Sequence, residues 1–280
     1  MSAALLPLGL AFLMLVVGLR LTLRDLASAF AQPRALLAGL AVQVVLLPLT
    51  ALALACLLAL PADLAVGLLI IAAAPGGITS NYIALAAGAD LALSIAMTLT
   101  TNLAAFLTVP AVMALSGVAV AGEAALPLFR ISLAMFAVTA VPLALGLALR
   151  RWAPVAMQRA APGFETAAKG VFAAIVLATF IENRDAIVSH ALSAGPAALA
   201  LNLAALGYGL AAGRLLALPT AQGRAIAIEA GMQNIALALF VSTVLLGRGD
   251  LALVGLVYAV VMNITALAVI AAARKATSAA

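Results

Sequence analysis

The chain has 280 residues, of which 67% are hydrophobic and only 8% are charged. Soluble domains carry about 25% charged and about 45–50% apolar residues, so this composition excludes an ordinary soluble domain and predicts an all-α polytopic membrane protein. The net charge of +5 does not indicate binding to nucleic acid, because the basic residues lie between apolar runs and form no single patch.

Nine apolar segments follow one another between clusters of charged and turn-forming residues. About 20 apolar residues cross a bilayer as a helix, so each segment is a predicted transmembrane helix. We expect these helices at residues 3–19, 35–59, 64–87, 91–116, 128–149, 170–188, 197–216, 224–246 and 251–273. The first is predicted to be retained rather than cleaved as a signal peptide, because it lacks a basic leader and a cleavage site. Residues 150–169 form the longest predicted loop.

The basic residues of the short loops predict how the chain is oriented. Most of the 14 Lys and Arg residues fall in loops that would share one side, at residues 20–34, 150–169, 214–224 and 274–275. Because cytoplasmic loops are enriched in Lys and Arg, we expect the N-terminus outside and the C-terminus in the cytoplasm. The predicted location is the plasma membrane, or the inner membrane of a bacterium.

Two of the predicted spans are interrupted by polar residues. The first interruption reads Ala-Pro-Gly-Gly-Ile-Thr-Ser-Asn at residues 74–81, and the second reads Glu-Ala-Gly-Met-Gln-Asn at residues 229–234. Pro75 cannot donate a backbone hydrogen bond, and Gly76 and Gly77 loosen the chain further. Interrupted apolar segments at corresponding places in two halves of a chain indicate the binding site of a transporter.

The spacing of polar residues in the two halves predicts an internal repeat. Leu60-Pro61 precedes the first broken span and Leu218-Pro219 precedes the second. Gln43 and Asn202 each lie in the span before those turns. Since the two broken spans would enter the membrane from opposite sides, we predict two inverted-topology repeats, residues 1–127 and 128–280. The first repeat has four spans and would have lost an ancestral first helix, and the second has five.

Glu229 is the carboxylate that falls well inside a predicted span. A charge at the bilayer centre costs about 2.5–3.5 kcal/mol on insertion scales, so such residues usually face the bundle interior and have a function. The functional interpretation is a cation ligand or a proton carrier. The structural alternative is a glutamate near a helix end that pairs with Arg224.

Hydroxyl and amide side chains accompany both breaks. Na⁺ prefers oxygen ligands, which carboxylates, amides, hydroxyls and unwound backbone carbonyls supply. Ser94 and Thr98 are four residues apart and therefore share one helix face. The alternatives are ordinary hydrogen bonds, within the helix for Ser94 and Thr98 and between helices for the amides. The polar residues considered are Gln43, Ser80, Asn81, Ser94, Thr98, Gln233 and Asn234.

Other classes of chemistry have little support in the sequence. His190 is the sole histidine and is predicted in an outside loop, so neither a histidine-based triad nor a histidine-ligated transition metal is indicated. Cys56 is the sole cysteine, so no internal disulfide can form. The chain is not predicted to be an enzyme, and no obligate protein partner is evident.

The two interruptions resemble the crossover motifs of the bile acid:sodium symporter family. Residues 75–81 are similar to the family's Pro-Gly-Gly-x-x-Ser-Asn, and residues 229–234 are similar to its Glu-x-Gly-Met-Gln-Asn. The resemblance implies two inverted repeats and two broken helices that cross. It also implies a core domain, roughly 35–116 and 197–273, and a panel domain, roughly 3–34 and 128–190.

The resemblance also implies two sodium ions and a substrate cavity. The first sodium site would comprise Ser80, Asn81, Ser94, Thr98 and Glu229. The second would comprise Gln43, Glu229, Met232 and Gln233, with a backbone oxygen from Ala230. The positions near the substrate are Ile78, Thr79, Asn234 and Asn263. Ile78 and Met262 replace a threonine and a histidine of some bacterial members, which leaves the substrate open.

We therefore predict a sodium-coupled symporter that moves a small organic anion across a lipid bilayer by alternating access. The family implies bile-acid-like anions, sulfated steroids, pantoate-like acids and keto acids as substrates. Within transport, the alternatives are proton coupling through Glu229 and a sodium-independent carrier. A membrane receptor that binds its ligand without moving it is the alternative from another class.

Overall fold

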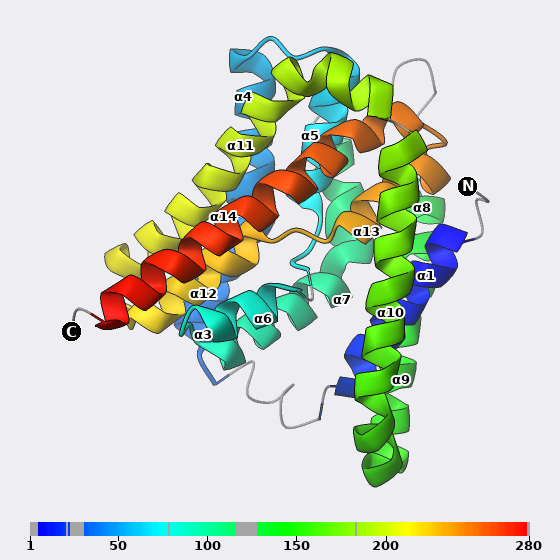
Figure 1. Cartoon of the computed structure of the whole chain (residues 1–280), viewed down its shortest axis with the longest axis vertical. Helices are drawn as coiled ribbons and strands as arrows, with labels where there is room; N and C mark the ends of the chain where they lie inside the picture. Colours follow the sequence, from blue (N-terminus) through cyan, green and yellow to red (C-terminus); the bar gives the residue numbers. More distant parts are fainter. Residues whose placement is uncertain are drawn as a thin grey trace.

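A computed structural model describes residues 5–20, 22, 31–77, 79–115, 128–182 and 184–278, and these residues are almost entirely helical (Figure 1). The α-helices are α1 (Leu5–Arg20), α3 (Pro33–Leu40), α4 (Leu47–Leu57), α5 (Ala62–Ala73), α6 (Thr79–Ala86), α7 (Leu91–Leu115), α8 (Leu128–Val138), α9 (Ala140–Trp152), α10 (Pro154–Glu182), α11 (Arg184–Leu215), α12 (Thr220–Gly231), α13 (Ile235–Leu239) and α14 (Ala252–Ser278). Two π-helical segments, η1 (Ala41–Leu46) and η2 (Phe240–Leu245), and a 3₁₀ turn, η3 (Gly249–Leu251), complete the set.

Within the residues that the structure describes, six helical segments are long and apolar enough to cross a bilayer. They span Pro33–Leu57, Leu91–Ala114, Phe129–Trp152, Pro154–Glu182, Leu192–Leu215 and Gly249–Lys275. Three shorter apolar helices, Leu5–Arg20, Ala62–Ala73 and Ile235–Leu245, accompany them. Since a span needs about 20 apolar residues, the chain is a polytopic helical membrane protein, as its composition predicts.

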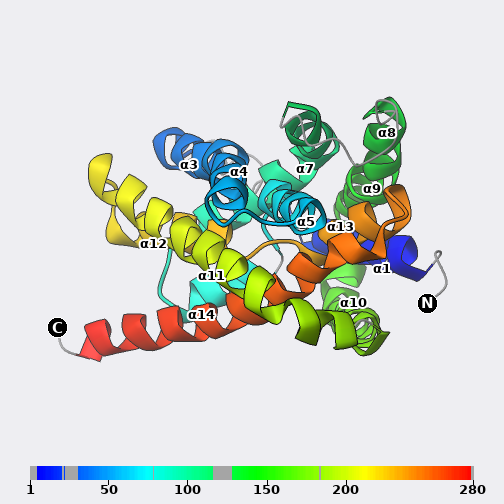
Figure 2. The same cartoon turned by 90° about the horizontal axis from the view of Figure 1, so that it is seen from above.

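The helices form two groups. In the first, α1 packs against α9 and α10, and α8 packs against α1 and α9. In the second, α11 packs against α12, α14 and α4, while α5 packs against α4, α7 and α14. Figure 2 shows the first group at one side of the molecule and the second group at the other. Helix α7 connects them, because it packs against α12 in one group and α8 in the other.

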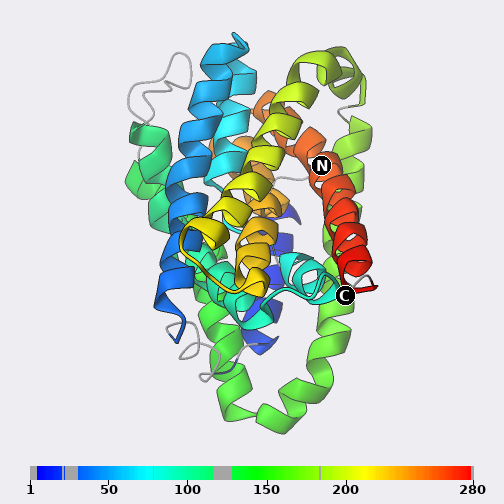
Figure 3. The same ribbon diagram turned by 90° about the vertical axis from the view of Figure 1, so that its left-hand side faces the viewer.

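Two predicted loops are helical in the structure. Helix α10 begins at Pro154, so the loop predicted at 150–169 is wrong over most of its length. Proline is favourable in the first turn of a helix, where its missing N–H has no partner to lose. Helix α11 runs from Arg184 to Leu215 (Figure 3), so His190 lies on a helix and not in a loop.

Both broken helices begin after the same kind of turn. Ala59 and Ala217 have positive φ angles of 47° and 49°, a conformation that alanine rarely adopts. The next residues close the preceding helices, with Leu60 N–H donating to the Ala55 carbonyl at 2.9 Å and Leu218 N–H donating to the Gly213 carbonyl at 2.8 Å. Pro61 and Pro219 then precede α5 and α12. The same turn therefore starts the corresponding helix in each half of the chain.

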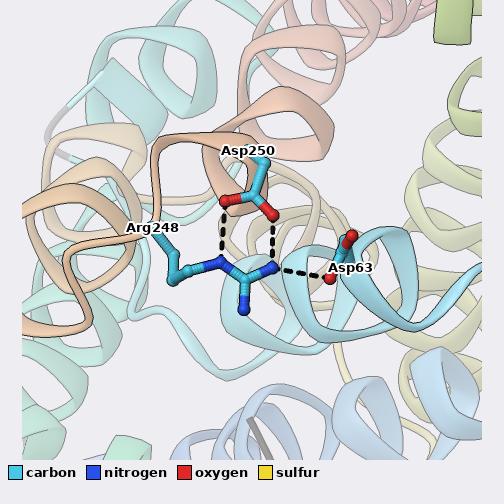
Figure 4. Close-up of polar contacts among 3 residues, drawn as sticks. All are labelled: Asp63, Arg248 and Asp250. Atoms are coloured by element: carbon cyan, nitrogen blue, oxygen red, sulfur yellow. Dashed lines mark hydrogen bonds and ion pairs between the residues drawn. The ribbon is translucent and has the colours of Figure 1, made fainter. Parts of the chain in front are cut away.

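An arginine connects the start of α5 to the turn before α14 (Figure 4). Arg248 donates from Nε and Nη2 to the two carboxylate oxygens of Asp250, at 3.0 and 2.5 Å. Its Nη2 also donates to Asp63 Oδ1 at 2.7 Å. Hydrogen bonds to Asp250 and then to Asp63 raise the pKa of Arg248 above its ordinary value. The tripeptide Arg248-Gly249-Asp250 is therefore a structural turn that secures the end of the second broken helix.

Candidate functional site

The two interruptions cross at the centre of the second helix group. Gly76 pairs with Gln233 as an isolated antiparallel bridge. Gly77 N–H donates to the Met232 carbonyl at 2.7 Å, and Asn234 N–H donates to the Pro75 carbonyl at 2.9 Å. Backbone groups that leave a helix inside a membrane protein need partners there, and here each break supplies them to the other.

Helix α7 holds this crossing through a side chain that sequence reasoning missed. Asn102 Nδ2 donates to the Gly76 carbonyl at 3.0 Å, and Asn234 Nδ2 donates to Asn102 Oδ1 at 3.2 Å. The Gly76 N–H donates to Thr101 Oγ1 at 3.4 Å. Asn102 follows Thr98 by four residues, so the sequence already indicated that it lies on the same face of α7 as Thr98.

A cluster of oxygen atoms surrounds the carboxylate of Glu229 on α12. Ser80 and Ser94 donate to its Oε2 at 2.6 and 2.9 Å, and Thr98 donates to its Oε1 at 2.5 Å. Ser94 also donates to Asn81 Oδ1 at 2.9 Å. The Glu229 side chain is fully buried. The five side chains expected at the first sodium site thus lie together, contributed by α6, α7 and α12.

The three hydroxyl groups can turn without losing a hydrogen bond. Each has one proton and two acceptors within reach. The second acceptor of Ser80 is the Gly77 carbonyl at 2.6 Å, that of Ser94 is Asn81 Oδ1, and that of Thr98 is the Ser94 carbonyl at 3.0 Å. When the protons move to these acceptors, the hydroxyl lone pairs are free to face a cation beside the carboxylate.

Glu229 does not pair with Arg224, which was the structural alternative for this carboxylate. Arg224 donates to the Ala87 carbonyl at 2.6 Å and turns toward the end of α6. Among the residues that the structure describes, no basic side chain forms an ion pair with Glu229. Burying an unpaired charge is costly, so this carboxylate needs a proton or a bound cation to balance it.

A second cluster joins the amides of Gln43 and Gln233. Gln233 Nε2 donates to the Ala230 carbonyl at 2.7 Å, which leaves its Oε1 to accept from Gln43 Nε2 at 2.8 Å. Gln43 Nε2 also donates to the Ala74 carbonyl at 2.9 Å. Because carbonyl oxygens can only accept, these contacts fix which end of each amide is nitrogen. The interhelical hydrogen bonds considered as an alternative for these amides are therefore present.

One oxygen of this second cluster lacks a partner. Across the described part of the chain, Gln43 Oε1 is the buried side-chain atom without a hydrogen bond. An unpaired buried acceptor is costly unless something fills its place. Gln43 lies on the π-helical segment η1, and such irregular turns occur frequently at functional sites. An amide oxygen of this kind is a ligand type that a hard cation prefers.

Asn202 occupies the corresponding position in the second half but is fully satisfied. Its Nδ2 donates to the Gly231 carbonyl at 2.9 Å, just as Gln43 donates to Ala74 at the end of α5. Its Oδ1 accepts from Thr265 Oγ1 at 2.7 Å. Tyr258, which is fully buried, also donates to the Gly231 carbonyl. In both halves a side-chain amide donates to the carbonyl at the break. The Asn202 oxygen accepts a hydrogen bond, whereas the Gln43 oxygen accepts none.

The residues expected near the substrate are more scattered. Asn234 is buried in the crossing, where its side chain caps α13 by accepting from Leu237 N–H at 3.1 Å. Thr79 is exposed at the start of α6. Asn263 is exposed on α14 and donates to the Ala259 carbonyl of its own helix at 2.7 Å. Ile78 lies outside the described residues.

Comparison with known proteins identifies the family. Residues 7–190 match the sequence model of the Sodium Bile acid symporter family. The chain belongs to this family. It is 30% identical over 235 residues to a protein of Arabidopsis thaliana named "Probable sodium/metabolite cotransporter BASS1, chloroplastic", covering 84% of this chain and 58% of that one. It is 29% identical over 238 residues to the "Uncharacterized sodium-dependent transporter YocS" of Bacillus subtilis, covering 84% and 72%.

A human relative has a less specific name. The "P3 protein" of Homo sapiens is 29% identical over 229 residues, covering 79% of this chain and 47% of that protein. The chain spans rather more than half the length of the plant relative and somewhat less than half of the human one. The names of the plant and Bacillus relatives are those of transporters and not of enzymes.

Proposed function

We propose that this protein is a sodium-coupled symporter of a small organic anion. The observation that carries the proposal is the buried Glu229 carboxylate, which three hydroxyls contact where two broken helices cross. Relatives named as sodium/metabolite cotransporters support it. The proposed location is the plasma or inner membrane, with the N-terminus outside, as the distribution of basic residues predicts.

The first ion is proposed to bind among Ser80, Asn81, Ser94, Thr98 and Glu229. One carboxylate charge balances one monovalent cation, and hydroxyl and amide oxygens are the ligands that a hard cation prefers. The second ion is proposed to bind at Gln43, with Glu229, Ala230, Met232 and Gln233 around it. The unpartnered Gln43 Oε1 supports that assignment, since a cation would satisfy it. When bound, the first ion would balance the charge of Glu229, and the two ions together would draw the two breaks toward each other.

Alternating access is proposed to arise from two inverted repeats. The matching turns at Ala59 and Ala217 and the matching anchors at Gln43 and Asn202 support the repeat boundaries at 1–127 and 128–280. The six longer and three shorter apolar helices of the described residues support nine passes through the bilayer. The group of α1, α8, α9 and α10 would act as the panel, and the helices around the crossing as the core. Sodium can shift the equilibrium between the two access states only by binding one more tightly than the other.

The substrate is proposed to be a small organic anion that meets Ile78, Thr79, Asn234 and Asn263. Bile-acid-like anions, sulfated steroids, pantoate-like acids and keto acids are the classes to test. The partial positive charge at the start of α6, where Thr79 lies exposed, suits an anionic group. Proton coupling through Glu229 is the second candidate mechanism, because a proton would also neutralise the buried carboxylate.

A sodium-specific thermal shift tests this proposal without a known substrate. The full chain, purified in detergent, is unfolded thermally in NaCl and in KCl at equal ionic strength. Saturating a folded-state site at about one hundred times its Kd adds about 2.7 kcal/mol of stability, so unfolding should occur at a higher temperature in NaCl. Uptake of the candidate anions into vesicles, with and without a sodium gradient, then identifies the substrate. Uptake driven by a pH gradient alone would contradict sodium coupling.

A further inference from the structure

Glu165 is a buried carboxylate that belongs to neither cluster around the crossing. It lies on α10 with a side chain only 10% exposed, and it forms ion pairs with Arg20 at the end of α1 and with Lys169 one turn along α10. Lys169 Nζ is 2.6 Å from Glu165 Oε1, whereas both basic side chains are about half exposed. The Glu165 carboxylate therefore has two basic partners, and its ion pair with Lys169 restricts the flexible lysine side chain.

Lys169 also contacts the second helix group. Its Nζ lies 3.9 Å from the ring centroid of Tyr82, which is well within the range of a cation–π interaction. Tyr82 belongs to α6, the helix that follows the first break, and is 43% exposed. Since α6 and α10 stand apart in Figure 1, the two long side chains bridge the space between them.

This contact crosses the boundary between the two groups of helices. Helix α10 packs with α1 and α9, whereas α6 packs with α7 and α12. Tyr82 follows Ser80 and Asn81 directly in α6, so a movement of this short helix would move two of the side chains around Glu229. A cation–π contact at an exposed position is weak, which makes it suited to a contact that forms and breaks repeatedly.

We propose that Glu165, Lys169 and Tyr82 form a latch that holds α6 against α10 in one access state and opens in the other. Glu165 acts as a positioning residue, since it fixes Lys169 and does not itself touch α6. The latch rests on the proposed transport function for its role in a cycle, but the contact and its effect on the two helix groups are measurable separately.

The test measures the distance between α6 and α10 directly. Spin labels are placed on Ala86→Cys and Gln158→Cys, which are exposed on α6 and α10, in a Cys56→Ser background of the full chain. Pulsed electron spin resonance then gives the populations of short and long distances. Lys169→Gln and Tyr82→Leu should each raise the ratio of long to short distances about two- to fivefold, the change expected for losing one exposed cation–π contact.

Conservative variants serve as matched controls. Tyr82→Phe keeps the ring and Lys169→Arg keeps the cation, so both should retain the parent distances. The latch is overturned if Lys169→Gln and Tyr82→Leu match the parent, or if Tyr82→Phe shifts as far as Tyr82→Leu. The sodium thermal shift is measured on the same parent protein. If sodium causes no thermal shift, the proposed sodium coupling is contradicted. The latch is tested only by the spin-label distances between α6 and α10.

Discussion

The two clusters around the crossing satisfy their polar atoms in different ways. Around Glu229, each hydroxyl has two acceptors and the carboxylate accepts three hydrogen bonds. Around Gln43, the amides form a chain in which each donor has a defined acceptor and one oxygen is left open. The first cluster therefore supplies charge and adaptable oxygens, and the second supplies a rigid, neutral oxygen.

This difference assigns distinct roles to the two proposed ions. An ion beside Glu229 neutralises a buried charge, which is a large electrostatic effect in a site shielded from water. An ion beside Gln43 Oε1 shares Glu229 with the first ion and adds a partner for one neutral acceptor, which is a smaller effect. Removing the first cluster should abolish the dependence of uptake on sodium. Removing the second should lower the Hill slope of uptake against sodium concentration.

Glu229→Ala should have the largest effect. Sodium-driven uptake should fall to background, and the sodium thermal shift of about 2.7 kcal/mol should disappear. The protein should still fold, because Ser80, Ser94 and Thr98 keep their alternative acceptors. The readout is vesicle uptake together with thermal unfolding in NaCl and KCl. Asp185→Ala, which removes an exposed carboxylate, serves as the control. Undiminished uptake by Glu229→Ala would refute the proposed coupling.

Gln43→Met should have an intermediate effect. The substitution keeps the side-chain length but removes both the open oxygen and the donor to Ala74 and Gln233. Leaving a buried acceptor unpaired costs about 1–3 kcal/mol, so the protein should unfold at a lower temperature. The Hill slope of uptake against sodium concentration should fall toward one. Thr50→Val, elsewhere on the following helix, should keep the wild-type slope, and a steep slope in Gln43→Met would argue against a second ion there.

Arg248→Gln should have the smallest effect. The ion pairs with Asp63 and Asp250 are exposed to solvent, and exposed pairs contribute little to stability. We expect a slight drop in melting temperature and an unchanged sodium thermal shift. Raising ionic strength with choline chloride should reduce the difference from wild type, because salt screens exposed charges. If Arg248→Gln abolished the thermal shift in NaCl, the turn at residues 248–250 would instead contribute to sodium binding.

The sequence by itself determined the class of protein and the chemistry at its centre. Membrane helices follow from local hydropathy, and helix breaks follow from proline, glycine and polar residues that are adjacent in the chain. The assignment of residues to two ion sites required the family resemblance, because Gln43, Ser94 and Thr98 lie outside the two contiguous motifs. Spacing alone placed Ser94 and Thr98 on one helix face.

Only the tertiary structure decided which distant side chains meet. Spacing places Asn102 on the same face of α7 as Thr98, but its contact with Gly76 follows only from the packing of helices. The contacts of Arg224 with Ala87 and of Lys169 with Tyr82 likewise join segments that are far apart in the chain. Glu165 lies within the loop predicted at residues 150–169, where the apolar pattern is interrupted, although Pro154 starts a helix there. Spacing determines which residues share a helix face, but the packing of whole helices determines which faces come into contact.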